Sequence, residues 1–300
     1  MQYPEKSTIL VQEVSTRDGL QNEPKILNPA QRIQIIKSLV EAGLRRIQIG
    51  SFVNPTLVPQ MAGSDQVWRD LDHDNRYVRY TVLILNEKGF KTALDLKVNH
   101  IEIYVSASET HSLKNSRMTV DRALDTAAGI IHLARDSGME VTGGIMCAFG
   151  CNFEGVISPE KVCRMVSLLL EAGATEIGLA DTTGMAKPGA IRSLIASVAR
   201  LTPLDIVGLH IHDTLGYGLA NIQAAIESGI RKFDSSVGGI GGCPFIPGAK
   251  GNVDTEKAVK LIEMLGFETG INLEKLRIAE SMLKNFLNVS KEQEKINTRK

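Results

Sequence analysis

Two histidines stand at the end of a short apolar segment that begins at residue 206. Turn-forming residues bound this segment, which is typical of a buried strand, and His210 and His212 lie two positions apart at its end. Side chains at that spacing point to the same face of a strand. The two imidazoles could therefore bind one metal ion, although a histidine beside an apolar strand is more often a hydrogen-bonded core residue.

The elements that would position these histidines follow a regular alternation of strand and helix. Apolar segments that predict strands begin at residues 8, 44, 78, 101, 139, 174, 206 and 230. Helical patterns such as those at residues 120–136 and 159–171 separate most of them, and three predicted helices end in a glycine before the next strand. Eight such units predict an α/β fold, the TIM (β/α)8 barrel. A doubly wound open sheet is the alternative, but the first strand is not followed by Gly-x-Gly-x-x-Gly, which favours closure.

One further helix is expected beyond the barrel. Asn272 fits an N-cap, and apolar side chains recur after it at helical spacing. They are Leu276, Ala279, Leu283, Phe286 and Leu287. We therefore predict a single catalytic domain over residues 1–289, with extra C-terminal helical structure that packs on the barrel or on a second subunit. Residues 290–300 are charged and are expected to form a frayed tail.

Composition excludes several classes of function. The chain of 300 residues is 43% hydrophobic and has no formal net charge, so it lacks the electrostatic footprint of a protein that binds nucleic acid or an anionic membrane. It has no apolar segment of about 18 residues and no N-terminal signal pattern, and we expect a soluble, cytoplasmic protein. Its four cysteines include no Cys-x-x-Cys pair and are expected to be free thiols.

The carboxyl ends of the strands of such a barrel meet at one mouth, where active sites lie. Polar side chains stand at this end of four predicted strands, and a glycine-rich segment follows the eighth. They are Arg17 and Asp18 after the first strand, Gln48 and Ser51 in the second, Asp181 and Thr182 after the sixth, His210 and His212 at the seventh, and Cys243 and Asn252 beyond the eighth. Arg17, Gln48, Ser51, Asp181 and Thr182 are the predicted substrate contacts. Asp181 and Thr182 would fit turn or capping residues equally well.

Four of these residues could hold a cation. Asp18, His210, His212 and Asn252 offer one carboxylate oxygen, two imidazole nitrogens and one amide oxygen. That set suits Mg²⁺ or Mn²⁺ better than zinc and leaves about two positions for a chelating substrate. The cation would lower the pKa of a substrate hydroxyl, whose alkoxide could collapse to a carbonyl and break a carbon–carbon bond.

Two more residues could complete that reaction. The enolate left by the bond cleavage needs a cation and an acid. Arg17 could supply the positive charge, because guanidinium stays protonated and donates several hydrogen bonds. Cys243 could supply the proton from its glycine-rich loop, although a lone cysteine in such a loop is more often structural.

With these residues in place, the chain resembles the 3-hydroxy-3-methylglutaryl-CoA (HMG-CoA) lyase family, part of a superfamily of metal-dependent TIM-barrel lyases and Claisen synthases. The resemblance extends from about residue 9 to residue 286. It rests on the motifs RDGLQNE at residues 17–23, SFVNP at 51–55, HIHDT at 210–214, DSSV at 234–237 and GGCP at 241–244.

The resemblance implies a role for each matching residue. It implies that Asp18, His210, His212 and Asn252 bind the cation and that Cys243 is the catalytic thiol. Arg17 is implied at the thioester carbonyl, and His210 is a further candidate for proton transfer. The implied reaction is retro-Claisen cleavage of HMG-CoA to acetyl-CoA and acetoacetate, the last step of leucine degradation. The resemblance further implies an acyl-CoA substrate, no organic cofactor, and a homodimer or higher homo-oligomer.

The chain departs from the family pattern at four positions of the predicted barrel. Gln48 stands where these lyases usually have glutamate, Thr142 where they have arginine, Gly144 where they have an aromatic residue, and Gly178 where they often have serine. Glutamine retains hydrogen-bonding geometry but removes a negative charge near Arg17 or the cation. The glycine at position 144 is expected to open a wall of the pocket.

These departures keep other functions open. A lyase of the same mechanism could act on a different 3-hydroxyacyl-CoA. A homologue that binds metal and acyl-CoA without catalysis is a further alternative, which Gln48 favours and Cys243 disfavours. A Claisen synthase is the weakest alternative, because those enzymes usually carry additional C-terminal domains.

Overall fold

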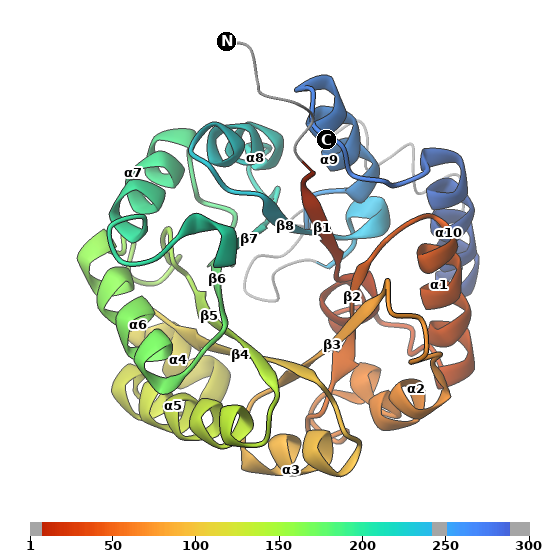
Figure 1. Ribbon diagram of the computed structural model, residues 1–300, viewed down its shortest axis with the longest axis horizontal. Coiled ribbons are helices and arrows are strands. Elements are labelled where there is room, and N and C mark those ends of the chain that lie inside the picture. Colours follow the sequence, from red (N-terminus) through yellow and green to blue (C-terminus); the bar gives the residue numbers. More distant parts are fainter. Residues whose placement is uncertain (1–7, 242–250, 289–300) are drawn as a thin grey trace.

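The computed structural model describes residues 8–241 and 251–288 and folds them into a closed barrel of eight parallel strands (Figure 1). The strands are β1 (Leu10–Glu13), β2 (Arg46–Ser51), β3 (Arg79–Ile84), β4 (His100–Ser106), β5 (Glu140–Met146), β6 (Glu176–Asp181), β7 (Val207–Ile211) and β8 (Lys232–Ser235). β1 pairs with both β2 and β8, so the sheet has no free edge. The predicted TIM barrel is confirmed.

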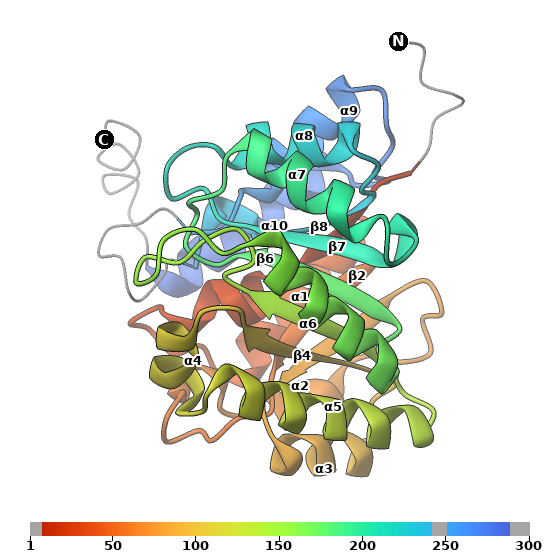
Figure 2. The ribbon, with the colours of Figure 1, turned by 90° about the vertical axis from the view of Figure 1, so that its left-hand side faces the viewer.

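Helices surround the barrel on its outside (Figure 2). They are α1 (Pro29–Glu41), α2 (Ser64–Asp70), α3 (Glu87–Asp95), α4 (Glu109–Ser116), α5 (Val120–Asp136), α6 (Pro159–Ala172), α7 (Pro188–Val198), α8 (Gly218–Glu227), α9 (Thr255–Met264) and α10 (Leu273–Leu287). Short helical turns are η1 (Ser15–Gly19), η2 (Pro59–Met61), η3 (Leu204–Ile206) and η4 (Val237–Gly239). Within the described ranges, none of these helices is long and apolar enough to cross a membrane.

Local sequence explains where these helices begin and end. The Asn28 side chain and the Gln31 side chain cap α1 reciprocally, and Pro29 occupies its first position,. Gly173 ends α6 with a φ of 110°, a left-handed conformation that glycine adopts without steric cost,. The predicted C-terminal helix is present as α10, capped by Asn272 and packed against α1. The predicted frayed tail lies outside the described residues.

The strands separate apolar from polar side chains. Ile47 and Ile49 of β2 lie in the apolar core, whereas Gln48 between them is hydrogen-bonded to buried side chains of β4 and of the turn after β1. Such alternation is expected when successive side chains point to opposite faces of a strand. Much of the barrel interior is therefore polar, whereas barrels are more commonly filled by branched aliphatic side chains.

The two ends of this interior carry separate sets of charged and polar side chains. We call the first set the barrel floor. It lies at the amino ends of the strands and comprises Arg46, His100, Thr142, Glu176 and Lys232. We call the second set the barrel mouth. It lies at the carboxyl ends and comprises Arg17, Asp18, His210, His212 and Asn252.

Candidate metal centre and active site

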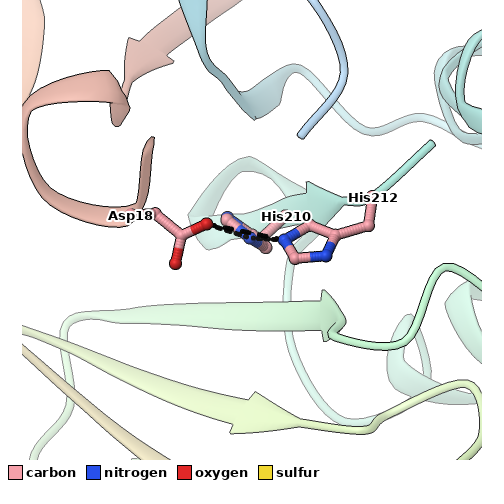
Figure 3. Close-up of side chains that lie close together, drawn as sticks. All are labelled: Asp18, His210 and His212. Atoms are coloured by element: carbon pink, nitrogen blue, oxygen red, sulfur yellow. Dashed lines mark hydrogen bonds and ion pairs between the residues drawn. The ribbon is translucent and has the colours of Figure 1, made fainter. Parts of the chain in front are cut away.

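Three predicted cation ligands converge at the barrel mouth (Figure 3). Asp18 comes from the turn after β1, His210 from β7, and His212 is the first residue after that strand. One carboxylate oxygen and one nitrogen from each imidazole all lie within 4.8 Å of one another. Oδ2 of Asp18 is 3.5 Å from Nε2 of His212 and 3.8 Å from Nε2 of His210.

Asn252, the fourth predicted ligand, lies beside this group. It forms an antiparallel bridge with His212, and its Nδ2 donates to Oδ2 of Asp18 at 2.8 Å. Among the described residues, neither Oδ1 of Asn252 nor Nδ1 of His212 has a hydrogen-bond partner, although both atoms are buried. A buried polar atom without a partner costs about 1–3 kcal/mol. The hydrogen bonds among the described residues therefore leave two buried polar atoms at the mouth without a partner.

The facing imidazoles have a spacing that suits a divalent cation. Nε2 of His210 lies 3.1 Å from Nε2 of His212. Two neighbouring ligands on an octahedral cation, with bonds of about 2.1 Å, are separated by about 3 Å. Oxygen and imidazole donors together suit Mg²⁺, Mn²⁺ or zinc. The residues that converge here therefore fit a divalent cation.

Asp234 on β8 orients the first imidazole. Its Oδ2 lies 3.1 Å from Nδ1 of His210, so a proton on Nδ1 leaves Nε2 available as a ligand. Burial would lower the pKa of His210, but the bond to Asp234 and the charge of Asp18 outweigh burial and raise it. Burial lowers the pKa of His212, and its bond to Asp18 does not compensate. The pKa values of the two neighbouring rings are thus shifted in opposite directions.

Asp18 is held in its charged form. Burial would raise its pKa, but the Arg17 guanidinium and a hydrogen bond from His212 hold that pKa well below its usual range. Nη1 of Arg17 lies 2.6 Å from Oδ1 of Asp18. The two residues are neighbours in the π-helical turn η1, which a single residue separates from the end of β1. A deprotonated carboxylate is the form that binds a cation.

Gln48 and Ser51 of β2 differ in what they contact. Oε1 of Gln48 accepts a hydrogen bond from Nε of Arg17, and its predicted contact with substrate stays a prediction. Oγ of Ser51 instead donates to the carbonyl of Leu83 at 3.0 Å. Ser51 therefore has a partner within the sheet, and its contact with substrate stays a prediction.

The predicted contacts after β6 also have protein partners. Asp181 accepts a hydrogen bond at 3.1 Å from the N–H of Met185, and Oγ1 of Thr182 accepts one at 2.9 Å from the N–H of Cys147. These are turn and loop interactions, which the sequence offered as the alternative to substrate binding. Cys243, the predicted catalytic thiol, lies outside the described residues.

The expectation of an opened pocket wall is wrong. A Cβ atom added to Gly144 would lie 2.1 Å from Cε1 of Tyr104, and one added to Gly178 would lie 2.5 Å from its hydroxyl oxygen. The Tyr104 ring, which comes from β4, thus covers both glycines. Thr142 lies deeper, at the floor, where its hydroxyl is 2.8 Å from Nε2 of His100.

Three residues near the site had no role in the prediction. Asp234 belongs to a quoted motif, but its contact with His210 depends on the pairing of β7 with β8. Glu102 and Tyr104 lie in the segment Ile-Glu-Ile-Tyr-Val of β4. A glutamate in the middle of an apolar strand is costly to bury without partners, and that signal could have identified Glu102.

The chain is similar throughout its length to known proteins. Residues 8–283 match the family model described as HMGL-like. The hydroxymethylglutaryl-CoA lyase of Pseudomonas mevalonii is 41% identical, over 89% of this chain and 88% of its own length. The (R)-citramalyl-CoA lyase of Chloroflexus aurantiacus is also 41% identical, over 92% of this chain and 90% of its own length.

A solved structure agrees with these sequence matches. The HMG-CoA lyase of Acinetobacter baumannii, determined with coenzyme A and 3-methylmalate, superimposes with a TM-score of 0.90 at 37% identity. The match covers 96% of this chain and 93% of that one. Sequence and fold therefore agree across the whole barrel.

Proposed function

Because the chain belongs to the HMGL-like family, we propose that it is a divalent-cation-dependent carbon–carbon lyase that cleaves HMG-CoA to acetyl-CoA and acetoacetate. The observation that carries the proposal is the convergence of Asp18, His210 and His212 at the mouth, beside the buried Oδ1 of Asn252, which has no partner among the described residues. Similarity to hydroxymethylglutaryl-CoA lyases over most of the chain supports the choice of substrate.

The proposed cation is Mg²⁺ or Mn²⁺, held by Asp18, His210, His212 and Asn252. When bound, it would supply a Lewis acid that lowers the pKa of the substrate hydroxyl. Asn252 would turn its amide so that Oδ1, which has no partner among the described residues, faces the cation. Asp234 would keep Nε2 of His210 free of its proton,.

The protein side chains would then accept and donate protons and stabilise negative charge. The proton of the C3 hydroxyl would pass to the Asp234 carboxylate, because Nδ1 of His210 already carries a proton and its Nε2 would hold the cation. The C2–C3 bond would break, with its electron pair passing to C2, so that C3 becomes the ketone of acetoacetate. The Arg17 guanidinium would stabilise the negative thioester oxygen of the resulting enolate. The Cys243 thiol would donate a proton to C2 and complete acetyl-CoA.

A second substrate has specific support. The chain is as similar to a citramalyl-CoA lyase as to an HMG-CoA lyase, at 41% identity in each case. Tyr104, Gly144 and Gly178 also give the barrel interior a wall that differs from the family pattern inferred from sequence. Cleavage of a different 3-hydroxyacyl-CoA by the same chemistry is therefore the alternative function.

The decisive experiment measures acetyl-CoA release from HMG-CoA and from citramalyl-CoA, with Mg²⁺, with Mn²⁺ and after chelation. We expect the higher kcat/KM with HMG-CoA, loss of activity after chelation, and at least about a 10³-fold lower kcat in Cys243→Ala. Preference for citramalyl-CoA would establish the alternative. Absence of cleavage of either thioester by folded, cation-bound protein would refute both.

Three finer expectations accompany the proposal. The enzyme would act in leucine degradation, reside in the cytoplasm and form a homodimer or larger homo-oligomer. Sedimentation of the purified full chain tests the oligomer. Localisation in fractionated source cells tests the compartment, and growth on leucine after gene deletion tests the pathway.

A further inference from the structure

A buried carboxylate on β4 connects three neighbouring strands. Glu102 is fully buried. Its Oε1 accepts hydrogen bonds from Nε2 of Gln12 at 3.0 Å and from Oγ1 of Thr81 at 2.5 Å. Its Oε2 accepts one from Nε2 of Gln48 at 2.6 Å. A charge in the middle of a barrel is costly unless such partners surround it, and the partners come from β1, β2 and β3.

The bond to Glu102 determines which way the Gln48 amide points. A carboxylate only accepts hydrogen bonds, so the amide nitrogen of Gln48 must face Glu102. The amide oxygen then faces Nε of Arg17, which donates to it. If the amide were reversed, its NH₂ group would oppose the N–H of the guanidinium. Glu102 thereby selects the one orientation of Gln48 that can bind Arg17.

Arg17 is consequently held from two sides. Its Nε donates to Gln48, and its Nη1 lies 2.6 Å from Oδ1 of Asp18. Asp18 keeps its other oxygen directed toward His212 and Asn252. A continuous series of hydrogen bonds thus runs from the middle of the barrel to the mouth, and Gln48 is the connecting residue.

This arrangement also accounts for glutamine at position 48. The family pattern predicts a glutamate there, near Arg17 or the cation. Here the amide keeps the hydrogen bond to Arg17, and the negative charge lies one residue further, on Glu102. Two adjacent carboxylates would repel each other and raise the pKa of one of them. A glutamine between the carboxylate and the guanidinium avoids that repulsion.

We propose that Glu102 is a positioning residue that orients Arg17 for catalysis through the amide of Gln48. The structural part of the proposal concerns the hydrogen bond from Arg17 to Gln48 and holds for any substrate. Its catalytic consequence rests on the lyase function proposed above.

The first test compares kinetics of three variants. Glu102→Gln removes the charge at nearly constant volume and lets the Gln48 amide reverse. We expect kcat to fall about 10- to 100-fold, as for a misplaced catalytic group, with KM changed less than about 3-fold.

The double variant Gln48→Glu/Glu102→Gln returns the carboxylate to Arg17 and should recover kcat to within about 5-fold of wild type. Glu13→Gln makes the same change at a fully buried glutamate that contacts none of the mouth residues, and should leave kcat unchanged.

The second test does not depend on activity. In protein labelled with ¹⁵N-arginine, the Nε–H signal of Arg17 should exchange slowly with water in the wild type, because that proton is hydrogen-bonded to Gln48. Exchange should accelerate at least about 10-fold in Glu102→Gln and recover in the double variant. Should Glu102→Gln fail to fold, Glu102→Asp shortens the carboxylate and gives the same measurements.

The outcomes separate this proposal from the proposed function. If the wild type cleaves no thioester but Arg17 exchange responds to Glu102→Gln, the lyase assignment fails and the positioning role stands. Unchanged exchange and kcat in Glu102→Gln would overturn the positioning role. A double variant as impaired as Glu102→Gln alone would overturn it as well, because Glu102 would then serve only the stability of the barrel.

Discussion

The two ends of the barrel interior use buried charge differently. At the floor, opposite charges meet in pairs: Arg46 and Lys232 lie 2.7 Å and 3.0 Å from Glu176. At the mouth, Arg17 pairs with Asp18, but Nε2 of His210 and Nε2 of His212 also face each other across 3.1 Å. Opposite charges in contact compensate for each other's burial and stabilise the fold. Ligand atoms that converge without such compensation can instead bind an added group. The charged groups of the floor thus have partners within the fold, whereas the two histidines of the mouth are the proposed cation ligands.

The largest expected effect comes from removing a ligand at the mouth. His212→Ala should weaken Mn²⁺ binding at least about 100-fold and lower acetyl-CoA release at least about 10³-fold, since the cation would lose one of its protein ligands. The chelated protein should lose about 2 kcal/mol of stability, because the buried imidazole leaves a cavity and its Nε2 loses its contacts with Asp18 and His210,. Calorimetric titration with Mn²⁺, thioester cleavage and urea unfolding measure the three quantities.

His100→Ala provides the matched control at the floor. His100 is as buried as His212, and its Nε2 lies 2.8 Å from the hydroxyl of Thr142. Its removal should cost about 2 kcal/mol of stability through a lost bond and a cavity, with Mn²⁺ affinity unchanged. A loss of Mn²⁺ affinity in His100→Ala equal to that in His212→Ala would contradict the division between the two ends.

The second prediction concerns the acid stability of the floor. Burial would raise the pKa of Glu176, but its bonds to Arg46 and Lys232 lower it to about 2. A carboxyl whose pKa is lowered on folding stabilises the protein above its unfolded value, and that contribution is lost as the pH falls from about 4.5 to about 2. Glu176→Gln should therefore cost about 3 kcal/mol at pH 7 and remove this acid-dependent loss.

Urea unfolding between pH 2 and 7 measures the effect of Glu176→Gln, and the value of kcat serves as its control. We expect kcat within about 3-fold of wild type, because Glu176 contacts the floor and not the mouth. If fully folded Glu176→Gln protein lost about 100-fold in kcat, the charge of Glu176 at the floor would be shown to affect catalysis at the mouth.

The sequence predicted one of these ends much better than the other. His210, His212 and Asp18 could be placed together because a closed barrel brings the carboxyl ends of its strands to one mouth. Helix boundaries such as that at Asn28 followed from capping chemistry that is local in sequence,. These inferences required the order of elements but no knowledge of side-chain contacts.

The contacts inside the barrel required information that one sequence does not contain. Gln48 meets Glu102 across an intervening strand, and the pairing of β2 with β3 shifts register between Gln48 and Gly50. A one-residue shift changes which side chains share a face. The replacement of an aromatic wall at Gly144 by Tyr104 from another strand is unpredictable for the same reason.

The third prediction concerns a buried carboxyl whose pKa is shifted in the opposite direction. Burial raises the pKa of Glu13 to about 7, although its bonds to Thr255 and to the N–H of Val237 oppose the shift. A carboxyl whose pKa is raised on folding favours the fold below the unfolded value, and stability falls as the pH rises from about 4.5 to about 7. In Glu13→Gln, the free energy of unfolding should no longer show this decrease with pH, which is up to about 3 kcal/mol in the wild type.

Urea unfolding of Glu13→Gln at pH 4.5, 6 and 7.5 checks that sign. The amide oxygen can still accept from Val237, and the amide nitrogen can donate to Oγ1 of Thr255, so the local bonds are retained,. A pH dependence identical to that of wild type would show that Glu13 is not the group that titrates. Glu13 and Glu176 would together show that similar carboxyls respond to pH with opposite sign.

The smallest expected effect lies between the two ends, at Tyr104. Burial raises the pKa of this phenol well above its usual range, and the negative charges of Asp234 and Glu102 raise it further, so it stays protonated in the wild type. Tyr104→Phe keeps the ring over Gly144 and should change kcat/KM for HMG-CoA less than about 3-fold, or under about 1 kcal/mol. Tyr104→Ala removes the ring and should raise relative kcat/KM for thioesters with one or two additional methylenes about 10-fold. If Tyr104→Phe instead loses as much activity on HMG-CoA as Tyr104→Ala, the Tyr104 hydroxyl takes part in the reaction, and Tyr104 does not act only by filling space.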